Sequence, residues 1–178
     1  GCVYVPVEKR QHPVWKDVRD SKQLSAGRRD DLFNIIQTQS MFGIGVASVE
    51  EIDEINILQA TYLAMARAIE AMVKNFSIPQ IDLVLIDGNR APKISYKAET
   101  LVKGDALSIS IGAASILAKV SRDRFMNDLH LQHTHYCWNS NAGYGTPEHL
   151  DAISKHGITP HHRKTFTPIK DIIFKQAS

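Results

Sequence analysis

Residues 81–89 read Ile-Asp-Leu-Val-Leu-Ile-Asp-Gly-Asn, a pattern that predicts a central strand followed by a turn. Ile81–Ile86 is short and mostly apolar, which is typical of a strand buried on both faces. Asp87 follows the strand directly, and Asp87-Gly-Asn89 predicts the turn that ends it. Helical patterns lie on either side of this strand. Strands that alternate with helices predict an α/β fold with a mixed or partly parallel sheet.

Two long helices are predicted around that strand. Ser48-Val-Glu-Glu51 fits a capping box and begins the first of them. Its apolar stripe is continuous and consists of Ile55, Leu58, Tyr62, Met65, Ile69 and Met72. The second runs over Ile109–Leu131. We also expect strands at Cys2–Val7, Phe42–Ala47 and Ser95–Lys103, a turn at Gly104-Asp105, helices at Ala26–Gln37 (with Ser25 as N-cap) and Glu148–His156, and loops at Glu8–Asp20 and Tyr136–Pro147.

Composition limits the class of protein. The chain has 178 residues, a net charge of +2 and 43% hydrophobic residues, which is globular composition. Its two cysteines, Cys2 and Cys137, fit a reducing compartment without a disulfide framework. No apolar run reaches the roughly 18 residues of a membrane span, and no signal-peptide pattern is present. We therefore expect a soluble cytoplasmic domain that does not act at a membrane, and nothing demands more than a monomer.

Two aspartates are candidate metal ligands. Asp87 lies at the carboxyl end of a strand, where open α/β sheets bind ligands, although an Asp that starts a turn explains it equally well. Asp123 lies at the edge of the apolar arc of its helix, and an ion pair with Lys119, Arg122 or Arg124 is the alternative. Carboxylates that converge from separate elements suit Mg²⁺, a hard ion that prefers oxygen ligands.

Other side chains are candidates for contacts with an anionic substrate. Lys22 and Lys103 lie in polar turns and could hold phosphate, or could simply be solvated. Tyr144 lies in a glycine-rich loop and could stack on a sugar or base, or could cover that loop. The basic cluster His161–Lys164 could bind a backbone phosphate, or could be a solvated tail. The spacing of His130, His133, His135 and Cys137 matches no closed zinc pattern well.

Ordered motifs cover most of the chain. No nucleotide-binding glycine motif and no serine-hydrolase or zincin motif occurs. The segments that do occur resemble the DSKKLS, EIDxxNIL, VDGN, KGD, AASILAKVxRD, GYGT and HRRSF motifs of the bacterial ribonuclease HII family. In chain order they are Asp20-Ser-Lys-Gln-Leu-Ser25, Glu51-Ile-Asp-Glu-Ile-Asn-Ile-Leu58, Ile86-Asp-Gly-Asn89, Val102-Lys-Gly-Asp105, Ala114-Ser-Ile-Leu-Ala-Lys-Val-Ser-Arg-Asp123, Gly143-Tyr-Gly-Thr146 and His162-Arg-Lys-Thr-Phe166.

The resemblance implies a ribonuclease H-like α/β fold. A mixed central sheet flanked by helices would occupy residues 1–135, and a substrate-contacting helical extension, residues 136–178, would belong to the same globular unit. The implied activity is hydrolysis of the RNA strand of RNA–DNA hybrids. Duplex DNA would also be nicked on the 5′ side of single embedded ribonucleotides, leaving 3′-hydroxyl and 5′-phosphate ends.

The resemblance also implies roles for individual residues. Four carboxylates would hold two Mg²⁺ or Mn²⁺ ions, one to activate water and one to stabilise the leaving oxygen. Asp87 and Asp123 match two of the four and are the expected catalytic and metal-binding residues. Tyr144 matches the tyrosine that packs beside the 2′-hydroxyl of the ribonucleotide. The expected substrate-binding positions are Tyr144, Gly143, Lys22, Lys103, Ser115, His162 and Arg163.

The sequence departs from the family pattern in two places. The family opens with a strand that carries an Asp-Glu pair and then Gly-Arg-Gly, whereas Gly1-Cys-Val-Tyr-Val5 resembles the strand after it. We therefore expect this chain to bind metal weakly, and to be unstable and inactive, unless that strand is supplied. Asn141-Ala142 replaces the His-Lys of many relatives before Gly143, which removes one expected phosphate contact.

Two alternative functions remain. One is a catalytically incomplete fragment that binds hybrid duplexes through its basic groups without cutting them. The other is a different nuclease of the same superfamily, such as a resolvase-like enzyme that acts on branched DNA. Insensitivity to ribonucleotides would identify the resolvase-like enzyme.

Overall fold

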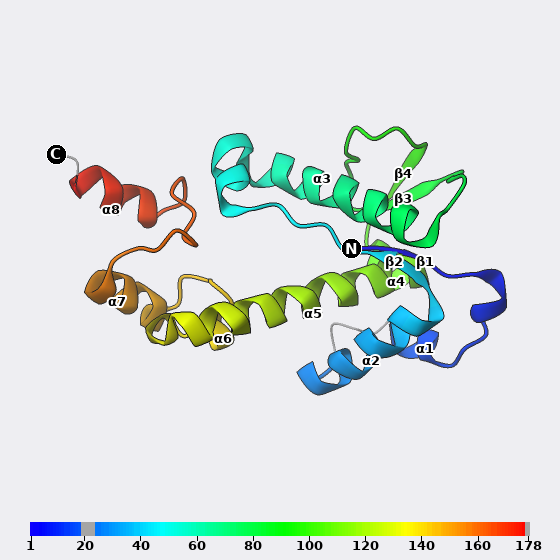
Figure 1. Ribbon diagram of the computed structural model, residues 1–178, viewed down its shortest axis with the longest axis horizontal. Coiled ribbons are helices and arrows are strands. Elements are labelled where there is room, and N and C mark those ends of the chain that lie inside the picture. The colour runs from blue at the N-terminus through cyan, green and yellow to red at the C-terminus, as the bar shows by residue number, and fades with distance from the viewer. Residues whose placement is uncertain (19–23, 177–178) are drawn as a thin grey trace. The chain divides into compact units, whose positions relative to one another are not determined.

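The chain folds into short strands and longer helices (Figure 1), as a computed structural model of residues 1–18 and 24–176 describes it. The α/β class is confirmed. The strands are β1 (Cys2–Tyr4), β2 (Met41–Gly43), β3 (Val84–Asp87) and β4 (Ala98–Leu101). The helices are η1 (Val7–Lys9), α1 (Val14–Val18), α2 (Ala26–Gln39), α3 (Val49–Phe76), α4 (Gly104–Leu107), α5 (Ile109–Gln132), η3 (Thr134–Tyr136), α6 (Trp138–Asn141), α7 (Pro147–His156) and α8 (Ile169–Gln176).

The strands form one antiparallel and one parallel pair. β1 pairs with β2 in antiparallel register, with Val3 opposite Phe42. β3 pairs with β4 in parallel register, with Ile86 opposite Thr100. The prediction that the strand before Asp87 is buried on both faces is wrong. Val84 and Ile86 are buried, but Leu85, which points to the other face, is 42% exposed.

Helix caps lie where the sequence predicts them. The Ser25 side chain accepts a hydrogen bond from the Arg28 amide and begins α2. Ser48 and Glu51 form the reciprocal capping box of α3: the Glu51 amide donates to Ser48 Oγ at 3.2 Å, and the Ser48 amide donates to Glu51 Oε2 at 2.8 Å. The pattern of short polar residues followed by glutamate therefore defines this helix start correctly.

The apolar stripe of α3 predicted one continuous helix, but the helix is interrupted. Asn56 has φ 68° and ψ 164°, which interrupts the helix. Its side-chain Oδ1 accepts hydrogen bonds from the amides of Leu58 (3.0 Å) and Gln59 (3.2 Å). Asn56 thus acts as the N-cap of a second helical segment, because its side chain accepts from the first amides of that segment.

Short helices occupy segments that were predicted as loops or turns. Glu8–Asp20 contains α1, where Trp15 is 4% exposed and donates its indole N–H to the Lys9 carbonyl at 2.7 Å. Tyr136–Pro147 contains α6, which is bounded by the positive-φ residues Cys137 and Ala142. Gly104-Asp105 begins α4 instead of forming a plain turn. Helices of four or five residues are too short to show a periodicity in sequence.

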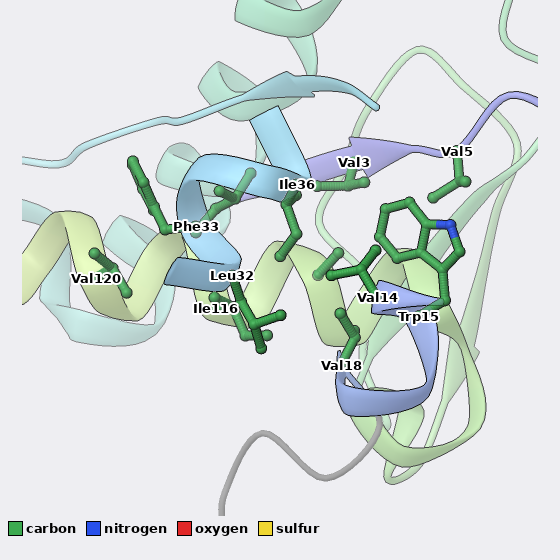
Figure 2. Close-up of a cluster of buried hydrophobic side chains, with 12 residues drawn as sticks. Val3, Val5, Val14, Trp15, Val18, Leu32, Phe33, Ile36, Ile116 and Val120 are labelled. Atoms are coloured by element: carbon green, nitrogen blue, oxygen red, sulfur yellow. The ribbon is translucent and has the colours of Figure 1, made fainter. Parts of the chain in front are cut away.

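The described residues divide into two compact units. The first consists of residues 1–46 and 61–120, and the second of residues 47–60 and 121–178. The first unit has its main core where side chains from β1, α1, α2 and α5 converge (Figure 2). Trp15, Leu32 and Ile116 are among the buried members of that core. A smaller cluster that includes Ile69 and Ile86 anchors β3.

The second unit has a separate core. It contains residues from α5, α6, α7 and α8, together with Tyr136 of η3, and its buried members are Met126, Leu129, Tyr136, Trp138, Ala152, Ile153 and Ile169. The Tyr136 and Trp138 rings stack with centroids 4.9 Å apart. Among the helices in residues 1–18 and 24–176, none combines the length and apolar character that crossing a membrane requires.

Candidate functional site

Asp87 ends β3 in the first unit. The buried side chains of Val84 and Ile86 fix the strand, and Gly88 turns the chain with φ 108°. The Asp87 side chain is exposed, and its Oδ1 accepts a hydrogen bond from the Gly104 amide at 2.9 Å. That hydrogen bond orients a carboxylate at the end of a strand, which is the position the sequence predicted.

The segment Lys103–Asp105 lies beside Asp87. Lys103 has φ 58° and is exposed, and it directly precedes α4. A Cβ added to Gly104 would lie 2.6 Å from Ile111 Cδ1 and 3.3 Å from Asp87 Oδ1. Asp105 is only 8% exposed, and its side chain accepts from the Ala106 amide at 3.1 Å. The structure therefore brings Asp87 next to the Lys103–Asp105 segment, and the missing side chain at Gly104 allows this close approach.

Asp123 and Ser115 both lie on α5, in different units. Ser115 is exposed in the part of α5 that belongs to the first unit. Asp123 is half-buried in the part that belongs to the second unit, which agrees with its predicted place at the edge of the apolar arc. Its neighbour Arg122 donates a guanidinium N–H to the Ala142 carbonyl at 3.0 Å.

Tyr144 projects from a tightly held loop of the second unit, and its side chain is 71% exposed. Before it, Ala142 and Gly143 have φ values of 49° and 81°. The buried Asn141 side chain supports this turn, since it donates to the Tyr136 carbonyl (2.7 Å) and accepts from the Gly143 amide (2.8 Å). An exposed aromatic ring on an ordered backbone can stack on a nucleotide at little entropic cost.

The residues His162 and Arg163 have different environments. His162 is 6% exposed, and burial, followed by the repulsion that a protonated His149 would exert, lowers its pKa to about 4. His162 therefore lies inside the second unit. Arg163 is half-buried, with its guanidinium 3.7 Å from the centroid of the Phe166 ring. Burial, and then the charge of Arg122, lower the pKa of Arg163.

The backbone after Arg163 is held by a carboxylate that the sequence reasoning missed. Asp53 of α3 accepts hydrogen bonds from the Lys164 amide (2.8 Å), the Thr165 amide (3.0 Å) and the Thr165 hydroxyl (2.6 Å). Burial raises the pKa of Asp53, but these hydrogen bonds and the Lys164 charge outweigh burial and lower it overall. Only the position of Asp53 within the EIDEIN segment could have drawn attention to it.

The donor chemistry of the two candidate ligands suits a hard divalent cation. Asp87 and Asp123 both offer carboxylate oxygens, the donors that Mg²⁺ and Mn²⁺ prefer. Over residues 1–18 and 24–176, no group of three or more His, Cys, Asp or Glu side chains is placed to hold a metal ion, whether a zinc cluster or a set of carboxylates. Lys22 lies outside the described residues.

Comparison with known sequences identifies the family. The family model described as ribonuclease HII matches residues 1–169. A protein named ribonuclease HII from Wolbachia pipientis subsp. Culex pipiens is 52% identical over 153 residues, covering 86% of this chain and 75% of the relative. Another of that name, from Anaplasma phagocytophilum, is 46% identical over 173 residues, covering 97% of this chain and 80% of the relative.

Comparison with solved structures supports the fold. Ribonuclease H2 from Pyrococcus horikoshii superposes with a TM-score of 0.70 at 21% identity, covering 98% of this chain and 88% of that one. A Bst-RNase HIII solved in complex with Mn²⁺ superposes with a TM-score of 0.66 at 16% identity, covering 89% of this chain and 58% of that one. These likenesses confirm the ribonuclease H-like fold. Taken with the sequence matches, they establish that the chain belongs to the ribonuclease HII family, a family of ribonuclease H endonucleases.

Proposed function

We propose that this chain, when an Asp-Glu strand completes its set of carboxylates, hydrolyses the RNA strand of RNA–DNA hybrids and nicks duplex DNA on the 5′ side of single embedded ribonucleotides. The products would carry 3′-hydroxyl and 5′-phosphate ends. The observation that carries the proposal is the Asp87 carboxylate, held at the end of β3 by the Gly104 amide at 2.9 Å, in a chain that matches the ribonuclease HII family over residues 1–169. A fixed carboxylate at a strand end suits metal-assisted phosphodiester hydrolysis.

Asp87 and Asp123 would provide two of the ligands for a pair of divalent ions. Bound Mg²⁺ or Mn²⁺ would supply the positive charge that lowers the pKa of water and stabilises the leaving oxygen. The hydrogen bond from Gly104 restricts the Asp87 side chain to one orientation, so little conformational entropy remains to be lost when it binds a cation. The solved Bst-RNase HIII complex with Mn²⁺ is consistent with this choice of metal.

Substrate would be held by an aromatic ring and by polar or basic side chains. Tyr144 would pack beside the nucleotide that carries the 2′-hydroxyl, and the preceding Gly143 would let the backbone approach it. Lys22, Lys103, Ser115 and Arg163 would contact backbone phosphates. His162 is buried, and we assign it a supporting role instead of a phosphate contact. The free Cys2 and Cys137 thiols fit a protein of the reducing cytoplasm.

A matched pair of aspartate substitutions tests the proposal. Asp87→Asn removes the charge of the candidate ligand, whereas Asp82→Asn makes the same change at an exposed residue just before β3. The sequence resemblance expects two further carboxylates on a strand ahead of Gly1. The assay therefore uses the chain as printed and the chain extended at its N-terminus by an Asp-Glu strand.

In the extended chain, Asp87→Asn should reduce cleavage at least about a hundredfold and keep duplex binding, whereas Asp82→Asn should leave cleavage unchanged. Salt-sensitive duplex binding by every variant, with no cleavage by the extended chain, would instead support the alternative of a fragment that binds hybrid duplexes without cutting them. Cleavage of branched DNA without regard to ribonucleotides would support the resolvase-like alternative.

A further inference from the structure

A buried pair of histidines lies directly behind the Tyr144 loop. His149 of α7 is 4% exposed and His162 is 6% exposed, and their Nε2 atoms are 3.3 Å apart. Both residues belong to the second unit, as do Trp138 and Tyr144, which contact His149. Buried imidazoles must have their nitrogens satisfied, so their hydrogen bonds determine which nitrogen carries the proton.

The hydrogen bonds of His149 define its tautomer. Its Nδ1 lies 2.8 Å from the Tyr144 carbonyl oxygen, which can only accept, so Nδ1 carries the proton and donates. Its Nε2 accepts the indole N–H of Trp138 at 3.0 Å. That lone pair is used by Trp138, which leaves no free imidazole nitrogen for a metal ion at this residue.

The hydrogen bonds of His162 are complementary to those of His149. Its Nδ1 accepts from the Thr159 amide at 3.0 Å, so the proton of a neutral His162 lies on Nε2. That N–H lies 3.3 Å from His149 Nε2, whose single lone pair is therefore shared between the Trp138 indole at 3.0 Å and the more distant His162. A proton on His149 Nε2 would face both donors, and the pair is consistent only with both rings neutral.

The charges around the pair favour the same state. The titratable groups that act on His162 are His149, His161 and His133, and all of them become positive when protonated. The neighbouring Tyr136 ring lies 5.9 Å from His149 and 5.0 Å from His162 between centroids, and its hydroxyl donates to the Gly157 carbonyl at 2.9 Å. The hydrogen bond with Thr159 acts in the opposite direction, but burial and these neighbouring histidines outweigh it and lower the pKa of His162 overall.

We propose that His149, with its tautomer set by Trp138 and His162, is a positioning residue that holds the Tyr144 carbonyl and so orders the loop that presents the Tyr144 ring to substrate. This inference rests on the proposed role of Tyr144 in substrate binding. The Tyr144 carbonyl oxygen accepts from the Thr146 amide (2.9 Å) as well as from His149. One oxygen therefore contacts both the N-cap residue of α7 and a side chain in its first turn. Loss of the imidazole donor would free the loop while leaving the exposed ring chemically intact.

The tautomers are the first test. Long-range proton–nitrogen NMR spectra at pH 7 should show His149 protonated only on Nδ1 and His162 only on Nε2. The two rings are assigned from the signals lost in His149→Gln and His162→Asn. A His149 ring protonated on Nε2, or on both nitrogens, would overturn the proposal.

Two substitutions of His149 separate its two hydrogen bonds. His149→Asn places an amide N–H near the position of Nδ1 and keeps a donor for Tyr144. His149→Gln places its amide near Nε2, so it keeps an acceptor for Trp138 and loses the donor. Hydrogen exchange should show protection of the Tyr144 and Thr146 amides reduced about tenfold in His149→Gln and nearly unchanged in His149→Asn. Equal effects of the two substitutions, or no effect of either, would contradict the positioning role.

Duplex binding separates failure of this inference from failure of the proposed function. The probe is duplex DNA with one ribonucleotide, and Tyr144→Ala is the reference variant. If Tyr144→Ala weakens binding and His149→Gln does so about tenfold while His149→Asn does not, both proposals are supported. If only Tyr144→Ala weakens binding, the positioning role is wrong. If Tyr144→Ala has no effect, the substrate contact of Tyr144 is wrong, and the tautomers and exchange rates alone decide the role of His149.

Discussion

At the residue scale, the orientation of the Asp87 side chain depends on a hydrogen bond from a glycine seventeen positions later in the chain. The Gly104 amide binds Asp87 Oδ1, and a side chain at 104 would meet Ile111 before it met the carboxylate. Position in the sequence identified Asp87 because a strand followed by Asp-Gly is a local signal. The local sequence pattern could not identify the Gly104 amide as the partner of Asp87, because the pairing of β3 with β4 brings that amide to the end of β3.

Tyr144 provides the sharpest prediction about specificity. Tyr144→Ala removes an aromatic surface that is 71% exposed, so it should reduce affinity for a ribonucleotide-containing duplex about tenfold without lowering the melting temperature. Tyr144→Phe keeps the ring and should bind within about twofold of the unsubstituted chain. The two are compared by fluorescence anisotropy at one salt concentration. Equal binding by Tyr144→Ala and Tyr144→Phe would count against stacking.

Gly43 provides a prediction about stability. A Cβ at Gly43 would lie 2.0 Å from the Ala68 carbonyl oxygen and 2.5 Å from the Met72 amide nitrogen, both backbone atoms of α3. Gly43→Ala should therefore lower the free energy of unfolding by about 3 kcal/mol. The control is Gly27→Ala in α2, where a Cβ would meet nothing within 4 Å. That change should be neutral or stabilising by up to about 1 kcal/mol. Similar urea midpoints for the two variants would be inconsistent with this close approach.

At the scale of elements, long periodic helices were predictable and short or interrupted ones were not. The helix α5 was predicted over Ile109–Leu131 and occupies Ile109–Gln132, because its apolar arc repeats over many turns. The break in α3 was missed, since Asn56 keeps the apolar spacing while its backbone leaves the helix. The exposed face of β3 was missed for a related reason: a run of apolar residues does not reveal whether one or both faces are covered.

Asp53 joins two elements of the second unit, and its carboxylate should determine the order of the segment after Arg163. Asp53→Ala removes the acceptor of the Lys164 and Thr165 amides and should destabilise that segment by about 1 kcal/mol. Hydrogen exchange of residues 163–166 should then speed up about fivefold at neutral pH. The control is Glu54→Ala, an exposed acidic neighbour. Unchanged exchange in Asp53→Ala would mean that other contacts hold this segment.

At the scale of the whole molecule, the buried histidine makes stability depend on pH. Burial, and then the repulsion that a protonated His149 would exert, lower the pKa of His162 from 6.5 to about 4. Between these values the unfolded chain binds a proton that the folded chain does not. Stability should therefore fall as the pH is lowered from about 6.5 to about 4, by up to about 3 kcal/mol.

His162→Asn tests this pH dependence, because an Asn oxygen keeps an acceptor for the Thr159 amide and does not titrate. The variant should show a shallower loss of stability between about pH 6.5 and about pH 4, measured by urea denaturation at a series of pH values. His156→Asn, a change at an exposed histidine, should leave the slope unchanged. Parallel pH profiles for the unsubstituted chain and His162→Asn would show that His162 is not the group responsible.

The candidate site was also only partly predictable at this scale. Local patterns identified Asp87, Asp123 and Tyr144, which lie at a strand end, at the edge of a helix face and in a glycine-rich loop. The same patterns predicted that His162 belongs to a basic cluster on the surface. In the structure His162 is buried and contacts His149. Burial of a polar residue depends on tertiary contacts between segments that are distant in sequence, and no local pattern reports them.

The most direct measurement is the position of the cut in duplex DNA that contains one ribonucleotide, with Mg²⁺ or Mn²⁺ present. It is made on the chain as printed, on the chain extended by an Asp-Glu strand, and on the Asp87→Asn variant of each. We predict a single cut on the 5′ side of the ribonucleotide by the extended chain, dependent on the metal and abolished by Asp87→Asn. Cleavage that persists in the extended Asp87→Asn variant, or that occurs equally in duplex DNA without a ribonucleotide, would contradict the account.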